Sequence, residues 1–74
     1  MNRYQPVRTV TVRADYSFPI HTAVVTIADD TECDDHRVLL DNEGKVVGWE
    51  DYDTGAWYTN TLFHDGCDEL LIVK

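Results

Sequence analysis

The chain has 74 residues, with 14 acidic and 6 basic side chains and a formal net charge of −8. This length suits a single domain, residues 1–74, and the acidity argues against direct binding of nucleic acid, because phosphate contacts need clustered Lys and Arg. A hydrophobic fraction of 43% argues against a disordered chain.

Along most of the chain, apolar and polar residues alternate with the period of two that is typical of β-strands. Turn signals with glycine, around Gly44 and Gly55, separate several of these stretches. Six strands are predicted, over residues 7–13, 20–28, 37–40, 45–52, 56–63 and 70–73.

The predicted fold is therefore all-β: a small antiparallel meander of about six strands that forms a rolled sheet or small barrel. Residues 29–36 leave room for one short helix. A chain of this size buries only about 60% of its surface on folding. A metal ion, a disulfide or a second copy in a homodimer would add stability to so small a core.

No apolar stretch is long enough for a membrane span or a targeting segment; residues 70–73 form the longest run. We therefore expect a cytoplasmic protein with no membrane partner. Two cysteines without a targeting segment favour a reducing compartment, where thiols or a metal site are more common than disulfides.

Charge is distributed unevenly. Residues 1–28 carry three arginines against Asp15, whereas residues 29–74 carry 13 acids against three basic side chains. Clustered carboxylates on a compact domain attract a basic surface of a partner protein. The acids that we expect to bind such a partner are Asp29, Asp30, Glu32, Asp34, Asp35, Glu50, Asp51 and Asp53.

A row of carboxylates can imitate the phosphates of a duplex and so occupy a nucleic-acid-binding groove. In size and composition the chain resembles small acidic phage proteins, including anti-CRISPR and anti-restriction inhibitors. The resemblance implies an inhibitor of a nucleic-acid-handling host defence complex that acts by DNA mimicry. Trp57 and Tyr58 are adjacent in a predicted strand and point to opposite faces, so one of them is expected to anchor the contact.

An alternative hypothesis rests on two short pairs, Cys33 with His36 and His64 with Cys67. Two such pairs can supply the four ligands of a structural zinc ion, in which case the acids only keep the protein soluble. A disulfide between Cys33 and Cys67 is a further possibility. No other cofactor is expected.

A third hypothesis is a small barrel that binds a peptide through exposed Trp and Tyr side chains. Catalysis is not expected, because Ser17 is the only serine and lacks the surroundings of a nucleophile elbow, and no glycine-rich phosphate loop is present. Binding through acids and binding through aromatics differ in their sensitivity to salt.

Overall fold

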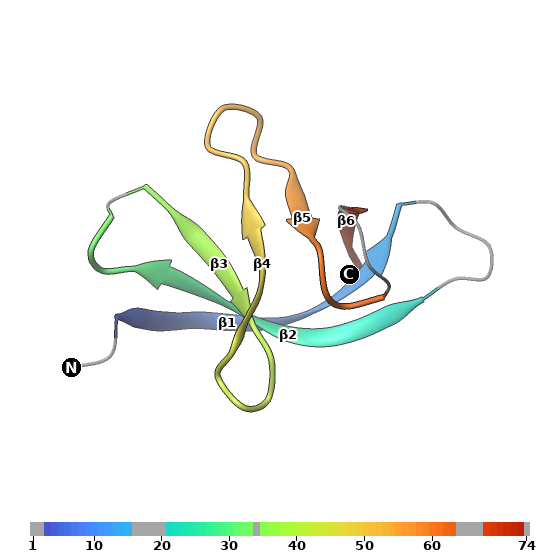
Figure 1. Cartoon of the computed structure of the whole chain (residues 1–74), viewed down its shortest axis with the longest axis horizontal. Helices are drawn as coiled ribbons and strands as arrows, with labels where there is room; N and C mark the ends of the chain where they lie inside the picture. The colour runs from blue at the N-terminus through green and yellow to red at the C-terminus, as the bar shows by residue number, and fades with distance from the viewer. Residues whose placement is uncertain (1–2, 16–20, 34, 64–67, 74) are drawn as a thin grey trace.

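The computed structural model describes residues 3–15, 21–33, 35–63 and 68–73. Six strands form in these ranges: β1 (Tyr4–Ala14), β2 (Thr22–Asp30), β3 (Arg37–Leu40), β4 (Val46–Glu50), β5 (Trp57–Thr59) and β6 (Asp68–Val73). Each strand pairs antiparallel with the next, and β6 pairs back with β1, so the sheet closes into a barrel (Figure 1). The predicted all-β meander is confirmed.

The short helix allowed for residues 29–36 does not form in the described part of that segment, which β2 and turns occupy. Across the four described ranges, no helix is long and apolar enough to cross a membrane.

The core follows the alternation of the strands. Inward-pointing side chains from all six strands meet in one cluster, while their neighbours point outward. The members of the cluster are Val10, Val12, Val25, Ile27, Leu39, Val47, Trp57 and Leu70. Burial of such a side chain contributes about 1.5–3 kcal/mol, so this cluster is the main source of stability.

Tight turns fix the order of the strands. Asp41 begins the β3–β4 turn, where its carboxylate accepts hydrogen bonds from the backbone N–H groups of Glu43 and Lys45, both at 2.9 Å. Gly44 has a φ of 80° and Gly55, in the β4–β5 turn, a φ of 77°, which side chains other than glycine adopt at a cost. Both glycines were predicted from the sequence to lie in turns.

The contact between β4 and β5 is unusually close at Gly48. A Cβ atom at this position would lie 2.6 Å from the carbonyl oxygen of Tyr58 and 3.0 Å from Cδ1 of Leu39. The buried hydroxyl of Thr59 also joins the strands, because it donates a hydrogen bond of 2.5 Å to the carbonyl oxygen of Val47. These contacts set the register that places Trp49 beside Tyr58.

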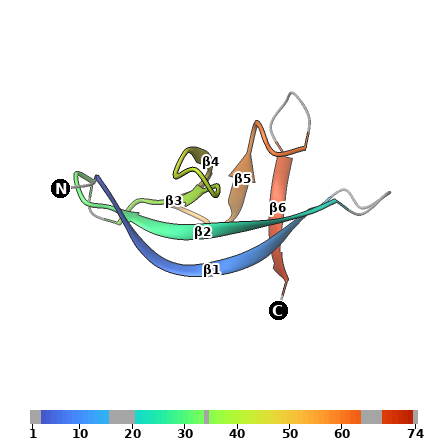
Figure 2. The same cartoon turned by 90° about the horizontal axis from the view of Figure 1, so that it is seen from below.

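β1 is longer than its pairing with β6. That pairing covers residues 11–14. Among the residues that the structure describes, residues 4–10 pair with β2 alone, and we call their other side the free edge of β1. The register of β1 against β2 shifts between Pro6 and Arg8, which marks a β-bulge at Val7. Figure 2 shows β1 and β2 as a long curved pair, with β3, β4 and β5 on one side of it and β6 crossing it in this view.

Candidate partner-binding surface

The loops that follow β2 and β4 carry most of the acids predicted to bind a partner. The rings of His36, just before β3, and Tyr52, just after β4, stack with their centroids 5.8 Å apart and an interplanar angle of 20°. This stack brings the two loops together at one end of the barrel. We call this region the acidic end and define it by the carboxylates Glu32, Asp35, Glu50, Asp51 and Asp53.

Asp30, although predicted to bind a partner, is used within the fold. Its side chain is only 7% exposed and accepts two hydrogen bonds of 3.1 Å from the guanidinium of Arg3. The hydrogen bond from Arg3 is the main reason why the pKa of Asp30 lies below its ordinary value, and the backbone N–H of Glu32 adds to it. Asp30 therefore ties the end of β2 to the start of the chain.

Two further acids of the first cluster have a positive neighbour. Asp29 lies 3.2 Å from Nε of Arg37, and Glu32 lies 3.6 Å from Nε of Arg3. All four side chains are about half exposed or more, so these pairs reduce the local charge without contributing much stability. Asp34 lies outside the described residues.

The other acids keep their charge uncompensated. Within the ranges that the structure describes, Asp35, Glu50, Asp51 and Asp53 take part in no ion pair. Asp51 also shapes its own loop, because its carboxylate accepts hydrogen bonds from the backbone N–H groups of Asp53, at 2.8 Å, and Thr54, at 3.2 Å. The acidic end thus contains four carboxylates that form no ion pair within the described residues.

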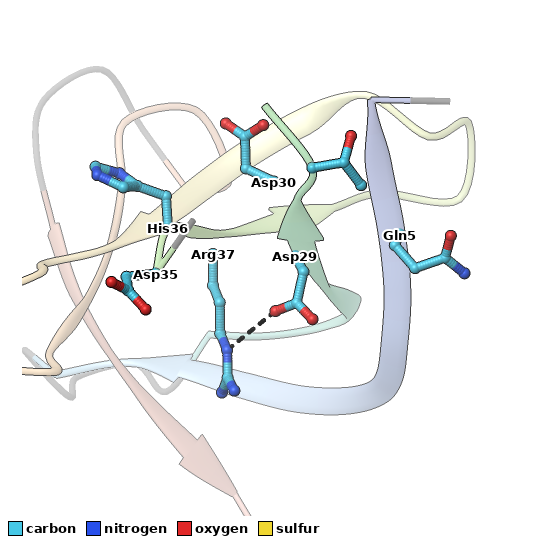
Figure 3. Close-up of a pocket in the computed structure, with 7 residues that line it drawn as sticks. Gln5, Asp29, Asp30, Asp35, His36 and Arg37 are labelled. Atoms are coloured by element: carbon cyan, nitrogen blue, oxygen red, sulfur yellow. Dashed lines mark ion pairs between the residues drawn. The ribbon is translucent and has the colours of Figure 1, made fainter. Parts of the chain in front are cut away.

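A surface hollow of about 750 Å³ lies beside the acidic end. Its lining is formed by Gln5, Asp29, Asp30, Thr31, Asp35, His36 and Arg37. Figure 3 shows the ion pair of Asp29 with Arg37 among the residues that line this hollow. Small-molecule sites are usually lined by apolar side chains, so this polar hollow fits a charged partner surface better.

The two adjacent aromatics of β5 lie on opposite faces, as alternation along a strand predicts. Trp57 is only 8% exposed and belongs to the core cluster. Tyr58 points outward and is half-buried, and its ring stacks on that of Trp49 with 6.1 Å between centroids. Of the two proposed anchors, Tyr58 is the accessible one.

Trp49 was not among the predicted site residues, although it is 36% exposed on the outer face. In the sequence, Trp49 lies two residues before Asp51, where the β4–β5 turn begins. Only the register of β4 decides which side of the sheet the Trp49 ring occupies. Tyr52, 64% exposed, was likewise missed as the residue that joins the two loops.

The four proposed zinc ligands are only partly described. Cys33 is a free, exposed thiol, and the ring of His36 stacks on Tyr52. His64 and Cys67 lie outside the described residues. Among the side chains that the structure does describe, no three His, Cys, Asp or Glu groups converge as metal ligands. The zinc hypothesis stays a prediction.

Comparisons with protein families, with curated protein sequences and with solved structures find no match for the chain. A functional proposal therefore depends on the geometry and charge of the acidic end and of the aromatic side chains beside it.

Proposed function

We propose that the protein is a binding module that docks its acidic end on a basic site of a partner protein. The observation that carries the proposal is the His36–Tyr52 stack, which unites two acidic loops that are 15 residues apart or more in the sequence. Clustered charge of one sign speeds association with a surface of the opposite sign and selects against acidic partners.

The test compares two variants that change the net charge equally. Asp35→Asn with Asp53→Asn neutralises two carboxylates of the acidic end, and asparagine tolerates the φ of 71° at position 35. Asp15→Asn with Glu43→Gln removes two exposed carboxylates elsewhere. The probe is a fluorescently labelled peptide of ten arginines, which represents a basic protein surface.

At low ionic strength we expect the first variant to bind the peptide roughly tenfold more weakly than the parent protein, with slower association, whereas the matched control changes little. Equal losses in both variants would contradict the proposal, because net charge alone would then account for binding. Raising the salt concentration should reduce the difference between the two variants.

The finer proposal is that the basic site is one that normally holds nucleic acid, as in a CRISPR effector complex or a restriction enzyme. The acidity of the loops and the small, closed barrel support DNA mimicry. The protein should then displace a labelled duplex from such a complex, and Asp35→Asn with Asp53→Asn should raise the concentration needed. Simultaneous binding of duplex and protein would contradict mimicry while leaving the acidic docking surface intact.

A further inference from the structure

The outer face of β3 to β6 carries a row of side chains whose chemistry changes along its length. Val38 pairs with Trp49, Trp49 with Tyr58, and Tyr58 with Glu69, each on a neighbouring strand. Tyr58 and Glu69 each lie between two buried residues, and directly paired residues of neighbouring strands share a face, so all four lie on the outer face. The row thus runs from an aliphatic side chain, through two stacked rings, to an exposed carboxylate.

The two rings form one continuous surface. Trp49 and Tyr58 are stacked at an interplanar angle of 26°, and Trp49 keeps 36% of its surface exposed. Neighbouring strands are about 4.8 Å apart, so Glu69 lies one strand spacing beyond Tyr58. Asp51, two residues after Trp49 and just beyond the end of β4, lies where the acidic end begins.

Carboxylates around an aromatic surface select for a cation. A guanidinium group stacks on an aromatic ring and at the same time presents a fork of N–H donors to a carboxylate. Nucleic-acid bases also stack on exposed rings, but their phosphates need basic neighbours. The basic side chain of β3, Arg37, is already paired with Asp29.

We propose that Trp49 and Tyr58 form an arginine-docking strip, in which a partner's guanidinium stacks on the rings and donates hydrogen bonds to Glu69 or to the acidic end. This inference rests on the proposed function, since it names the partner side chain that the acidic surface recognises. It commits to an arginine-bearing protein segment as the occupant.

The test measures a preference rather than total affinity. Fluorescence anisotropy follows the binding of three labelled probes: ten arginines, ten lysines and a single-stranded DNA of ten thymidines. The two peptides have equal charge, so their affinity ratio reports what distinguishes a guanidinium from an ammonium group, and the change of that ratio in the ring variants isolates the stacking contribution. We expect a roughly two- to fivefold preference for arginine, which persists at salt concentrations that weaken both peptides.

Trp49→Leu should bring the ratio close to one, whereas Trp49→Phe, which keeps a ring, should retain most of it. Tyr58→Leu serves as a second variant, and thermal unfolding of each variant verifies the fold. An unchanged ratio in both leucine variants would overturn the strip. Binding of the DNA probe that Trp49→Leu abolishes would also overturn it, because the rings would then bind bases.

The same measurements separate the two proposals. If Asp35→Asn with Asp53→Asn weakens both peptides while Trp49→Leu leaves the ratio unchanged, the acidic end stands and the strip does not. The opposite result is that Trp49→Leu removes the preference for arginine while Asp35→Asn with Asp53→Asn binds as well as the control with Asp15→Asn and Glu43→Gln. That result would support the arginine-docking strip and contradict docking through the acidic end.

Discussion

Gly48 is the residue on which the β4–β5 register depends. Alanine would place a Cβ atom 2.6 Å from the carbonyl oxygen of Tyr58, which is backbone and cannot move aside cheaply. We expect Gly48→Ala to lower the free energy of unfolding by about 1–3 kcal/mol, because the strands must separate to admit the methyl group. Urea unfolding followed by circular dichroism measures the change.

Gly44→Ala provides the matched control. A Cβ atom at Gly44 meets no heavy atom within 4 Å, so the substitution introduces backbone strain alone, from a φ of 80°. That strain costs about 1 kcal/mol. A smaller loss at Gly48 than at Gly44 would show that the close approach of β4 and β5 is not limiting.

The contact between Asp30 and Arg3 predicts a stability that depends on pH. The pKa of Asp30 lies below its ordinary value of 3.8, mainly because of the hydrogen bond from Arg3. As the pH falls, the unfolded chain takes up this proton before the folded chain does, so the stabilisation is full above pH 3.8 and is lost below it.

Thermal unfolding across an acid pH series tests this linkage. The parent protein should lose melting temperature more steeply below that pH than Asp30→Asn, which lacks the titrating group. Asp29→Asn removes the neighbouring exposed carboxylate and should keep most of the parent slope. Equal flattening in both variants would show that the contact with Arg3 is not the cause.

At the level of elements, the His36–Tyr52 stack connects loops that belong to different hairpins. Aromatic pairs contribute about 0.5–1.5 kcal/mol beyond the burial of their area. We expect Tyr52→Ala to increase amide hydrogen exchange in residues 31–36 and 51–56 while the strands keep their protection. Tyr52→Phe retains the ring and should behave like the parent protein. Faster exchange throughout the strands would mean that the stack supports the whole barrel.

The strands themselves were predictable, since the period of two and the glycine turns appear directly in the sequence. Their ends differed by a few residues: β5, predicted over 56–63, covers only Trp57–Thr59. The hydroxyl of Thr59 accepts hydrogen bonds from the backbone N–H groups of Thr61 and Leu62, which turns the chain away from the sheet. The period of two in the sequence does not reveal these side-chain hydrogen bonds, so the early end of β5 could not be predicted.

The site was predictable only in part. The acids of both loops could be named from clustering, but their different roles could not, because Asp30 is neutralised by Arg3, 27 residues earlier. Alternation placed Trp57 and Tyr58 on opposite faces, yet it could not decide which face is the core. That choice follows from barrel closure, which brings Trp57 opposite Leu70 of β6.

At the scale of the whole molecule, the open point is whether the barrel needs a metal ion, a disulfide or a second copy for its stability. The core takes side chains from all six strands, and His36 is engaged with Tyr52. We therefore expect a chelator to leave the melting temperature unchanged. Native mass spectrometry should then show the mass of the bare chain, and it also counts the copies in any oligomer. A bound zinc ion and a sharp loss of stability in Cys33→Ser would instead establish the zinc hypothesis.

The free edge of β1 has a consequence for how copies of the protein behave at high concentration. An exposed strand edge invites the same edge of another molecule to add to it, which is a common start of fibre formation. Here Pro6 has no N–H to donate, the bulge at Val7 interrupts the spacing of the backbone groups, and Arg8 adds a charge. Replacing Pro6 and Arg8 with threonine and valine should therefore promote fibre formation.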